Sequence, residues 1–204
     1  MFTGLVKEVG KLEEVERRDD GLRVRIACSL HPYELGESIA VDGVCLTVKS
    51  CTTEHFDADA SLETLDKSNL GDRGVGDGVH LERALGLGDK MGGHLVTGHV
   101  DGVGHLIGKT PTGDYIRAEF EVPDRLAPFL APKGSITVNG VSLTVNRVNG
   151  TRFDVMLVPY TLDETTFGRM TASTRVNLEV DILAKYVASL MGKPGVDGTP
   201  ADQG

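Results

Sequence analysis

The chain has 204 residues, enough for one large domain or two small ones, and 30 acidic against 21 basic residues give a formal charge of −9. No part of the sequence gathers Lys and Arg, so a nucleic-acid partner is not expected. No run of about eighteen apolar residues is present, so a membrane-spanning helix is not expected, and the first residues carry no secretory signal pattern. The three cysteines form no CxxC pair and are typical of reduced thiols in a cytoplasmic protein.

The sequence repeats itself. SIAVDGVCLTV at 38–48 matches SITVNGVSLTV at 135–145 at 8 of 11 positions, with a shift of 97 residues. The same shift aligns two later pairs of segments, 56–71 with 153–168 and 79–82 with 176–179. A shift of 94 aligns TGLVKEVG at 3–10 with TGHVDGVG at 97–104. The pattern predicts an internal duplication, with an N-terminal domain over 1–90 and a C-terminal domain over 91–185.

Within each unit the sequence is typical of short β-strands. Segments such as LRVRIAC at 22–28 alternate apolar and polar residues. The pairs Asp42-Gly43 and Asn139-Gly140 indicate hairpin turns, because they tolerate the positive φ that a two-residue turn needs. Thr64 and Thr161 each open a short helical piece and are expected to cap it. Many short strands with frequent turns favour a small closed barrel in each unit, since closure leaves no open edge.

The repeated phrase places its side chains on two faces. Val44, Leu46 and Val48 point one way and predict a core face, while Cys45 and Thr47 point the other way. The second copy repeats the arrangement with Val141, Leu143 and Val145 against Ser142 and Thr144. The small polar face is either the solvent side of a strand or the lining of a pocket. His94 and His99, five apart on an apparent strand, would point to opposite faces, so a shared metal ion is not expected.

The end of the chain has no counterpart of equal length in the first unit. A helix is predicted over 181–191, with Asp181 in its first turn. Its apolar stripe comprises Ile182, Leu183, Tyr186, Val187, Leu190 and Met191. Such a helix packs on its own chain or pairs with neighbouring chains, and we favour the second. The Gly/Pro-rich tail 192–204 is expected to be disordered.

Eight motifs resemble the riboflavin synthase alpha-chain family over about residues 1–185. They are MFTGLV, GVCLTV, ETLDKSNLG, VHLERAL, GGHLVTGHVDG, KGSITVNGVSLTV, PYTLDETTFG and RVNLEVDIL. The resemblance implies an all-β fold of two tandem six-stranded Greek-key barrels related by internal duplication, plus a C-terminal α-helix that supports trimers. It implies a transferase that turns two molecules of 6,7-dimethyl-8-ribityllumazine into riboflavin and 5-amino-6-(D-ribitylamino)uracil by moving a four-carbon unit. It further implies no cofactor or metal, an active site between the N-barrel and the C-barrel of neighbouring subunits of a homotrimer, and an association with lumazine synthase.

Carried over residue by residue, the resemblance predicts one substrate site per barrel. The site of the N-terminal barrel is expected to comprise Gly4, Leu5, Val6, Cys45, Leu46, Thr47, Asp59, Ala60, Ser61, Leu62, Glu63 and Thr64. The site of the C-terminal barrel is expected to comprise Gly98, His99, Val100, Lys133, Ser142, Leu143, Thr144, Met156, Leu157, Val158, Pro159, Tyr160 and Thr161. The predicted catalytic residues are Phe2, Thr3, Ser38, Cys45, His99, Ser142 and Asp181.

Several of these residues have a second interpretation. Cys45 either adds to C7 of a substrate as a thiolate or fills space. Asp181 either transfers a proton or caps the helix, and we favour the cap. Ser38 and Ser142 are interpreted as ribityl contacts rather than catalysts. Phe2 is either a core anchor or a lid that stacks on substrate, and we favour the lid.

One alternative function has the same fold. Lumazine proteins resemble these enzymes but only hold a ligand, and they usually lack the FTG opening. Phe2-Thr3-Gly4, His99 and the C-terminal helix favour the enzyme. The sequence departs from the family pattern at Tyr160, where an acid like Glu63 is expected, and at Asn139, where an Asp is often seen. His80 stands where its repeat has Asn177.

Overall fold

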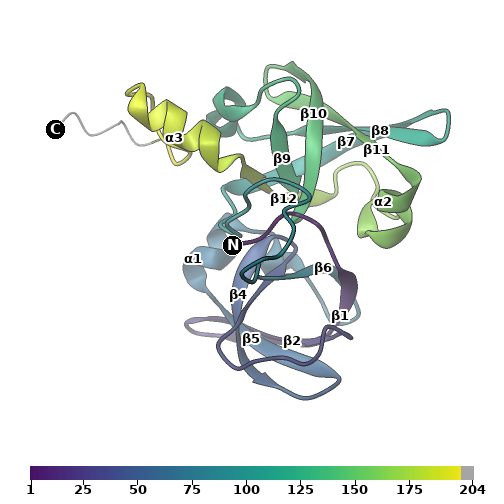
Figure 1. Cartoon of the computed structure of the whole chain (residues 1–204), viewed down its shortest axis with the longest axis vertical. Coiled ribbons are helices and arrows are strands. Elements are labelled where there is room, and N and C mark those ends of the chain that lie inside the picture. The colour runs from purple at the N-terminus through teal and green to yellow at the C-terminus, as the bar shows by residue number, and fades with distance from the viewer. Residues whose placement is uncertain (199–204) are drawn as a thin grey trace.

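The computed structural model describes residues 1–198, which form two closed six-stranded antiparallel barrels (Figure 1). The strands of the N-terminal barrel are β1 (Glu8–Arg18), β2 (Gly21–Ala27), β3 (Ser38–Val41), β4 (Val44–Cys51), β5 (His55–Ser61) and β6 (Gly78–Arg83). Those of the C-terminal barrel are β7 (Gly102–Thr112), β8 (Tyr115–Glu121), β9 (Ser135–Val138), β10 (Val141–Asn149), β11 (Arg152–Leu157) and β12 (Arg175–Val180). Around the first barrel the order is β1-β2-β5-β4-β3-β6, and the second barrel repeats it as β7-β8-β11-β10-β9-β12. This Greek-key order confirms the predicted duplicated all-β fold.

The helices are short and lie outside the barrels. They are α1 (Leu62–Lys67), η1 (Leu70–Asp72), η2 (Asp124–Phe129), α2 (Pro159–Glu164), η3 (Thr166–Gly168) and α3 (Ile182–Leu190). The prediction that Thr64 and Thr161 cap α1 and α2 is wrong, because both lie inside the helices. Ser61 caps α1 by accepting from the Thr64 N–H at 3.2 Å, and Pro159 opens α2 at a position that needs no N–H donor.

α3 confirms the predicted C-terminal helix within a residue at each end. Asp181 accepts from the Leu183 N–H at 3.0 Å, so the favoured helix-cap interpretation is confirmed. α3 projects from the C-terminal barrel (Figure 1), and several of its apolar side chains are exposed. None of the helices over residues 1–198 is long and apolar enough to cross a membrane. Part of the predicted disordered tail, 199–204, lies outside the described residues.

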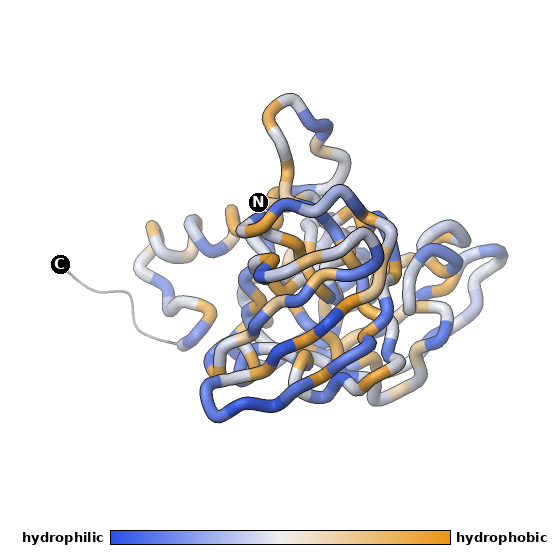
Figure 2. Tube along the Cα trace, turned by 90° about the horizontal axis from the view of Figure 1, so that it is seen from below, coloured by the Kyte–Doolittle hydropathy of each residue, from blue (hydrophilic) through white to orange (hydrophobic). Residues whose placement is uncertain are grey.

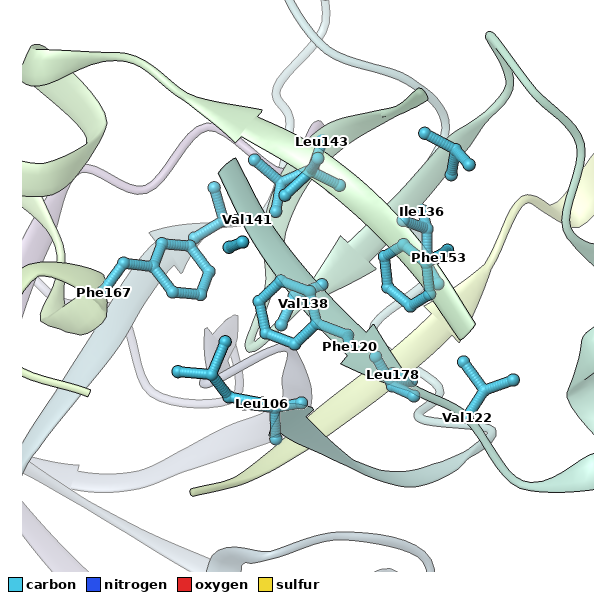
Figure 3. Close-up of a cluster of buried hydrophobic side chains, with 14 of the residues drawn as sticks. Leu106, Phe120, Val122, Ile136, Val138, Val141, Leu143, Phe153, Phe167 and Leu178 are labelled. Carbon is cyan, nitrogen blue, oxygen red and sulfur yellow. The ribbon is translucent and has the colours of Figure 1, made fainter. Parts of the chain in front are cut away.

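Each barrel encloses its own apolar core. In the C-terminal barrel Phe120 and Phe153 stack with ring centroids 5.4 Å apart, and Phe167 closes one side of the cluster (Figure 3). Buried and exposed residues alternate along strands such as β5 and β11, as a barrel with a filled interior requires. Figure 2 shows short hydrophobic and hydrophilic stretches interspersed along the trace. The predicted core face of the repeated phrase is confirmed, since its six aliphatic residues Val44, Leu46, Val48, Val141, Leu143 and Val145 are all buried.

The two copies of the repeated phrase meet at their turns. Asp42 and Gly43 have φ of 46° and 80°, Asn139 and Gly140 have 46° and 76°, and both pairs form the predicted two-residue turns. A Cβ built on Gly43 would lie 2.7 Å from the backbone nitrogen of Gly140, and the reverse distance is also 2.7 Å. Glycine is therefore required at both positions for two reasons: the positive φ, and the close contact between the two turns, which leaves no room for a Cβ.

Candidate functional site

The first residues of each unit cross over to the opposite barrel. The Ser142 N–H of β10 donates to the Gly4 carbonyl at 2.8 Å, and the Cys45 N–H of β4 donates to the Gly98 carbonyl at 2.8 Å. Val6 packs against the core of the C-terminal barrel, and Val100 packs against that of the N-terminal barrel. The predicted grouping, with 4–6 at the N-terminal site and 98–100 at the C-terminal site, is therefore wrong, and the two segments are exchanged. Alignment of the repeats shows which residues are equivalent, but it carries no information about which barrel each one touches.

Two buried carboxylates hold the crossing segments in place. Glu82 of β6 accepts from the N–H and hydroxyl of Thr3, both at 2.7 Å, and from the Gly4 N–H at 2.9 Å. Glu179 of β12 makes the equivalent three contacts with Thr97 and Gly98, at 2.7, 2.7 and 3.0 Å. Burial raises the pKa of Glu179 above its ordinary value, against the opposing effect of these hydrogen bonds. Each barrel thus fixes a backbone segment against the other.

Glycine is needed where the crossing segments touch the repeated strands. Gly4 and Gly98 have φ of 77° and 79°, a conformation that other residues rarely adopt. A Cβ on Gly98 would lie 2.7 Å from the Cβ of Cys45, and one on Gly4 would lie 2.6 Å from that of Ser142. The backbone can therefore approach the polar face of β4 and β10 only where a side chain is missing.

A hollow of about 240 Å³ lies on the N-terminal barrel at this crossing. It is lined by β4, α1 and the crossing segment, with the residues Val44, Cys45, Glu63, Thr64, Lys67, Ser68, Gly98, His99 and Val100. Cys45 is half-buried and His99 is exposed. The hollow therefore brings together the predicted residues Cys45, Glu63, Thr64 and His99, from both halves of the chain.

β4, which lines this hollow, is paired with β5 over only part of its length. Pairing of β4 with β5 runs no further than Val48 opposite Ala58, so among the described residues 44–47 and 59–61 are not paired with each other. In the C-terminal barrel the pairing of β10 with β11 likewise stops at Val145 opposite Val155. Backbone N–H and C=O groups along such edges can bind the polar rim of a flat heterocycle.

A histidine of the segment between β6 and β7 lies against Ser142 of the C-terminal barrel. His94 Nδ1 lies 2.7 Å from Ser142 Oγ, and the neighbouring Gly93 also packs on Ser142. Burial lowers the pKa of His94 below its ordinary value, while the negative charge of Asp181 acts in the opposite direction. Sequence reasoning missed His94 as a site residue, although the motif GGHLVTGHVDG contains it. It also placed 94–99 on a strand, whereas only Val96 is bridged there, to Phe2.

Two of the predicted catalytic residues, Phe2 and Thr3, make structural contacts. Phe2 is completely buried beside Ala40 and Val96, so the favoured lid interpretation is wrong and the residue is a core anchor. The Thr3 hydroxyl is engaged by Glu82. Ser38 lies half-buried opposite Thr47 in the β3–β4 pair.

The other predicted binding residues fall into three groups. The side chains of Leu46, Ala60, Leu143 and Leu157 are buried in the barrels, so only their backbone can reach a ligand. The carboxylate of Asp59 is ion-paired with Arg23 and Lys49, both at 2.6 Å, and the Arg23 guanidinium holds the pKa of that carboxyl far below its usual range. The exposed or half-buried residues are Leu5, Thr47, Ser61, Leu62, Lys133, Thr144, Met156, Val158, Pro159, Tyr160 and Thr161.

The chain is similar to known proteins over nearly its whole length. The "Lumazine binding domain" family matches the chain twice, at residues 3–84 and 97–181. Riboflavin synthase of Brucella abortus is 43% identical over 197 residues, covering 93% of this chain and 98% of the relative. Riboflavin synthase of Bacillus subtilis is 36% identical over 201 residues, covering 98% and 94%. The chain belongs to the riboflavin synthase family.

The solved structures that resemble this chain include the protein LumP, in complexes with riboflavin and with 6,7-dimethyl-8-(1'-D-ribityl) lumazine. The TM-scores are 0.82 and 0.80 at 23% identity, covering 88% of this chain and 99% of LumP. At this identity the likeness shows the shared two-barrel fold. Across residues 1–198, no three His, Cys, Asp or Glu side chains are grouped so as to hold a metal ion.

Proposed function

We propose that the chain converts two molecules of 6,7-dimethyl-8-ribityllumazine into riboflavin and 5-amino-6-(D-ribitylamino)uracil. The observation that carries this proposal is a pair of equivalent candidate sites, one at Cys45 of β4 and one at Ser142 of β10. At each site the backbone N–H of the strand residue donates to the carbonyl of a glycine from the opposite unit, Gly98 or Gly4. A reaction that joins two copies of one compound needs two similar places, and it needs them to differ so that one molecule donates the four-carbon unit and the other accepts it. The family relationship supports the same reaction.

The chemistry of the two places differs in three of the repeat positions. The N-terminal barrel has Cys45, Glu63 and the crossing residue His99, whereas the C-terminal barrel has Ser142, Tyr160 and Leu5 at the equivalent positions. At the C-terminal barrel, neutral His94 is placed to take a proton through the Ser142 hydroxyl, which suits removal of a proton from an acidic methyl group. At the N-terminal barrel, Cys45 and His99 supply a nucleophile and a proton carrier in one hollow.

The two substrates must also be held face to face. We propose that the N-terminal barrel of one subunit meets the C-terminal barrel of another in a homotrimer, with α3 at the subunit contact. The exposed apolar side chains of α3, Leu183, Tyr186, Val187 and Leu190, support an association of this kind. Holding two reactants together in this way lowers a barrier by roughly 7–11 kcal/mol. The cytoplasmic location and the association with lumazine synthase stay predictions.

The test is incubation of the purified protein with 6,7-dimethyl-8-ribityllumazine alone. Riboflavin is followed by absorbance and chromatography, and the expected yield is one riboflavin for two lumazines consumed. Tight binding of lumazine without riboflavin would contradict the proposal and would favour a ligand-holding protein. The buried Phe2-Thr3-Gly4 segment favours the enzyme, because its Gly4 carbonyl accepts from the Ser142 N–H and so forms part of the candidate site on the C-terminal barrel.

A further inference from the structure

Asn177 and His80 occupy equivalent buried positions in β12 and β6 at the junction of the barrels. The Asn177 Nδ2 donates to the carbonyl of Asp42 at 2.9 Å, and its Oδ1 accepts from the Asn69 N–H at 2.7 Å. Asn69 follows α1 closely, and α1 carries Glu63 and Lys67 of the hollow on the N-terminal barrel. A residue of the C-terminal barrel thus fixes a helix of the N-terminal site.

His80 repeats this pattern in the opposite direction with a different side chain. Its Nδ1 lies 2.8 Å from the carbonyl of Asn139, and its Nε2 accepts from the Thr166 N–H at 2.8 Å. Asn139 and Thr166 are the repeat equivalents of Asp42 and Asn69. Thr166 follows α2, the helix that carries Tyr160 and Thr161. A residue of the N-terminal barrel thus fixes the helix of the C-terminal site.

These two contacts determine where the imidazole carries its proton. A backbone N–H can only donate and a carbonyl can only accept, so Nε2 is unprotonated and Nδ1 holds the hydrogen. A second proton on Nε2 would face the Thr166 N–H and break that hydrogen bond, although the Thr166 hydroxyl, 2.9 Å away, can rotate to accept from it. Asn177 makes the same two hydrogen bonds and does not titrate.

The surroundings of His80 agree with a neutral ring. The charged groups that face it are the carboxylate of Asp42, 3.6 Å from Nδ1, and Arg73, which is ion-paired with that carboxylate. The uncharged ring of Phe167 in η3 packs on the other side. Burial lowers the pKa of His80, outweighing the effect of Asp42, while Arg73 acts in the same direction as burial.

We propose that His80 is a positioning residue for the site of the C-terminal barrel, which its neutral form holds in place through Thr166 and which acid releases. The N-terminal site, held by Asn177, lacks this sensitivity. The link to catalysis rests on the proposed function, but the hydrogen bonds themselves do not, so the two can be tested separately.

The experiment is hydrogen exchange by mass spectrometry on the full chain, without substrate, at about pH 7.5 and about pH 5. Protection of 159–168 is compared with that of 62–71, each relative to unstructured peptide at the same pH. The variants are His80→Leu, which removes both hydrogen bonds, His80→Asn, which copies the repeat, and Asn177→Leu as the matched change at the other barrel. Steady-state kcat and KM for lumazine are measured on the same samples.

In the wild type, acid is expected to lower protection of 159–168 by roughly tenfold and to spare 62–71. His80→Leu should lower protection of 159–168 at both pH values and raise KM roughly fivefold to tenfold, and His80→Asn should restore both and abolish the dependence on acid. Asn177→Leu should affect 62–71 instead. Equal acid sensitivity in wild type and His80→Asn would overturn the proposal, and this comparison holds even if His80→Leu does not fold. If hydrogen exchange follows the expected pattern but no riboflavin forms, the positioning role of His80 stands and only the proposed function is overturned.

Discussion

The back-to-back turns provide the sharpest test of how the barrels are joined. We expect Gly140→Ala to destabilise the protein far more than a glycine substitution at an ordinary turn. The left-handed conformation at φ of 76° costs an alanine about 1–2 kcal/mol. The new Cβ would lie 2.7 Å from the nitrogen and 2.9 Å from the Cα of Gly43, so the two backbones must separate, and such overpacking typically costs about 1–3 kcal/mol. The sum is about 2–5 kcal/mol.

Gly150→Ala is the matched control in the same barrel. Gly150 has a similar φ of 60°, but a Cβ built on it would meet nothing within 4 Å, so only the backbone cost of about 1–2 kcal/mol applies. The free energy of unfolding of both variants is measured by urea titration, together with wild type. Equal losses for Gly140→Ala and Gly150→Ala would refute the reasoning, because they would show that the contact between the turns adds nothing.

Four further predictions follow from the site and its supports. His94→Gln is expected to lower kcat by about 10²-fold while lumazine still binds, because glutamine cannot take a proton; a kcat within about twofold of wild type would contradict this. In the wild type, burial lowers the pKa of His94 below its ordinary 6.5. We therefore expect kcat/KM to stay level as the pH falls to about 6.5 and to decline only below it. A pH profile with a midpoint above 6.5 would argue against His94 as the base. Lys185→Met removes the ammonium 2.6 Å from buried Asp101 and should cost about 3 kcal/mol at neutral pH. Because burial raises the pKa of Asp101, the loss should shrink in acid, where a protonated carboxyl needs no cation, and urea titration at two pH values checks this. Deletion of all residues after Val180 should yield monomers with little activity, and sedimentation of an active trimer would contradict the role of α3.

The turns, the core faces of the strands and the helix cap could be predicted from short stretches of sequence. The Asp-Gly and Asn-Gly pairs predict their turns because positive φ is a property of single residues, and alternation along β4 and β10 predicts which side chains enter the core. Asp181 was expected to cap α3 for a similar reason, since a cap acts within one turn of helix.

The amino-acid sequence by itself determined the duplication, the barrel class and the family. Only the tertiary structure decided that 4–6 and 98–100 exchange barrels, that Phe2 is buried beside Ala40 and Val96, and that His94 lies on Ser142. The physical reason is distance along the chain. Hydropathy periods and turn preferences act over a few residues, whereas Ser142 lies 138 positions from Gly4 and 48 from His94. Such pairs are brought together only by the folded arrangement of the two barrels, and no repeat alignment contains that information.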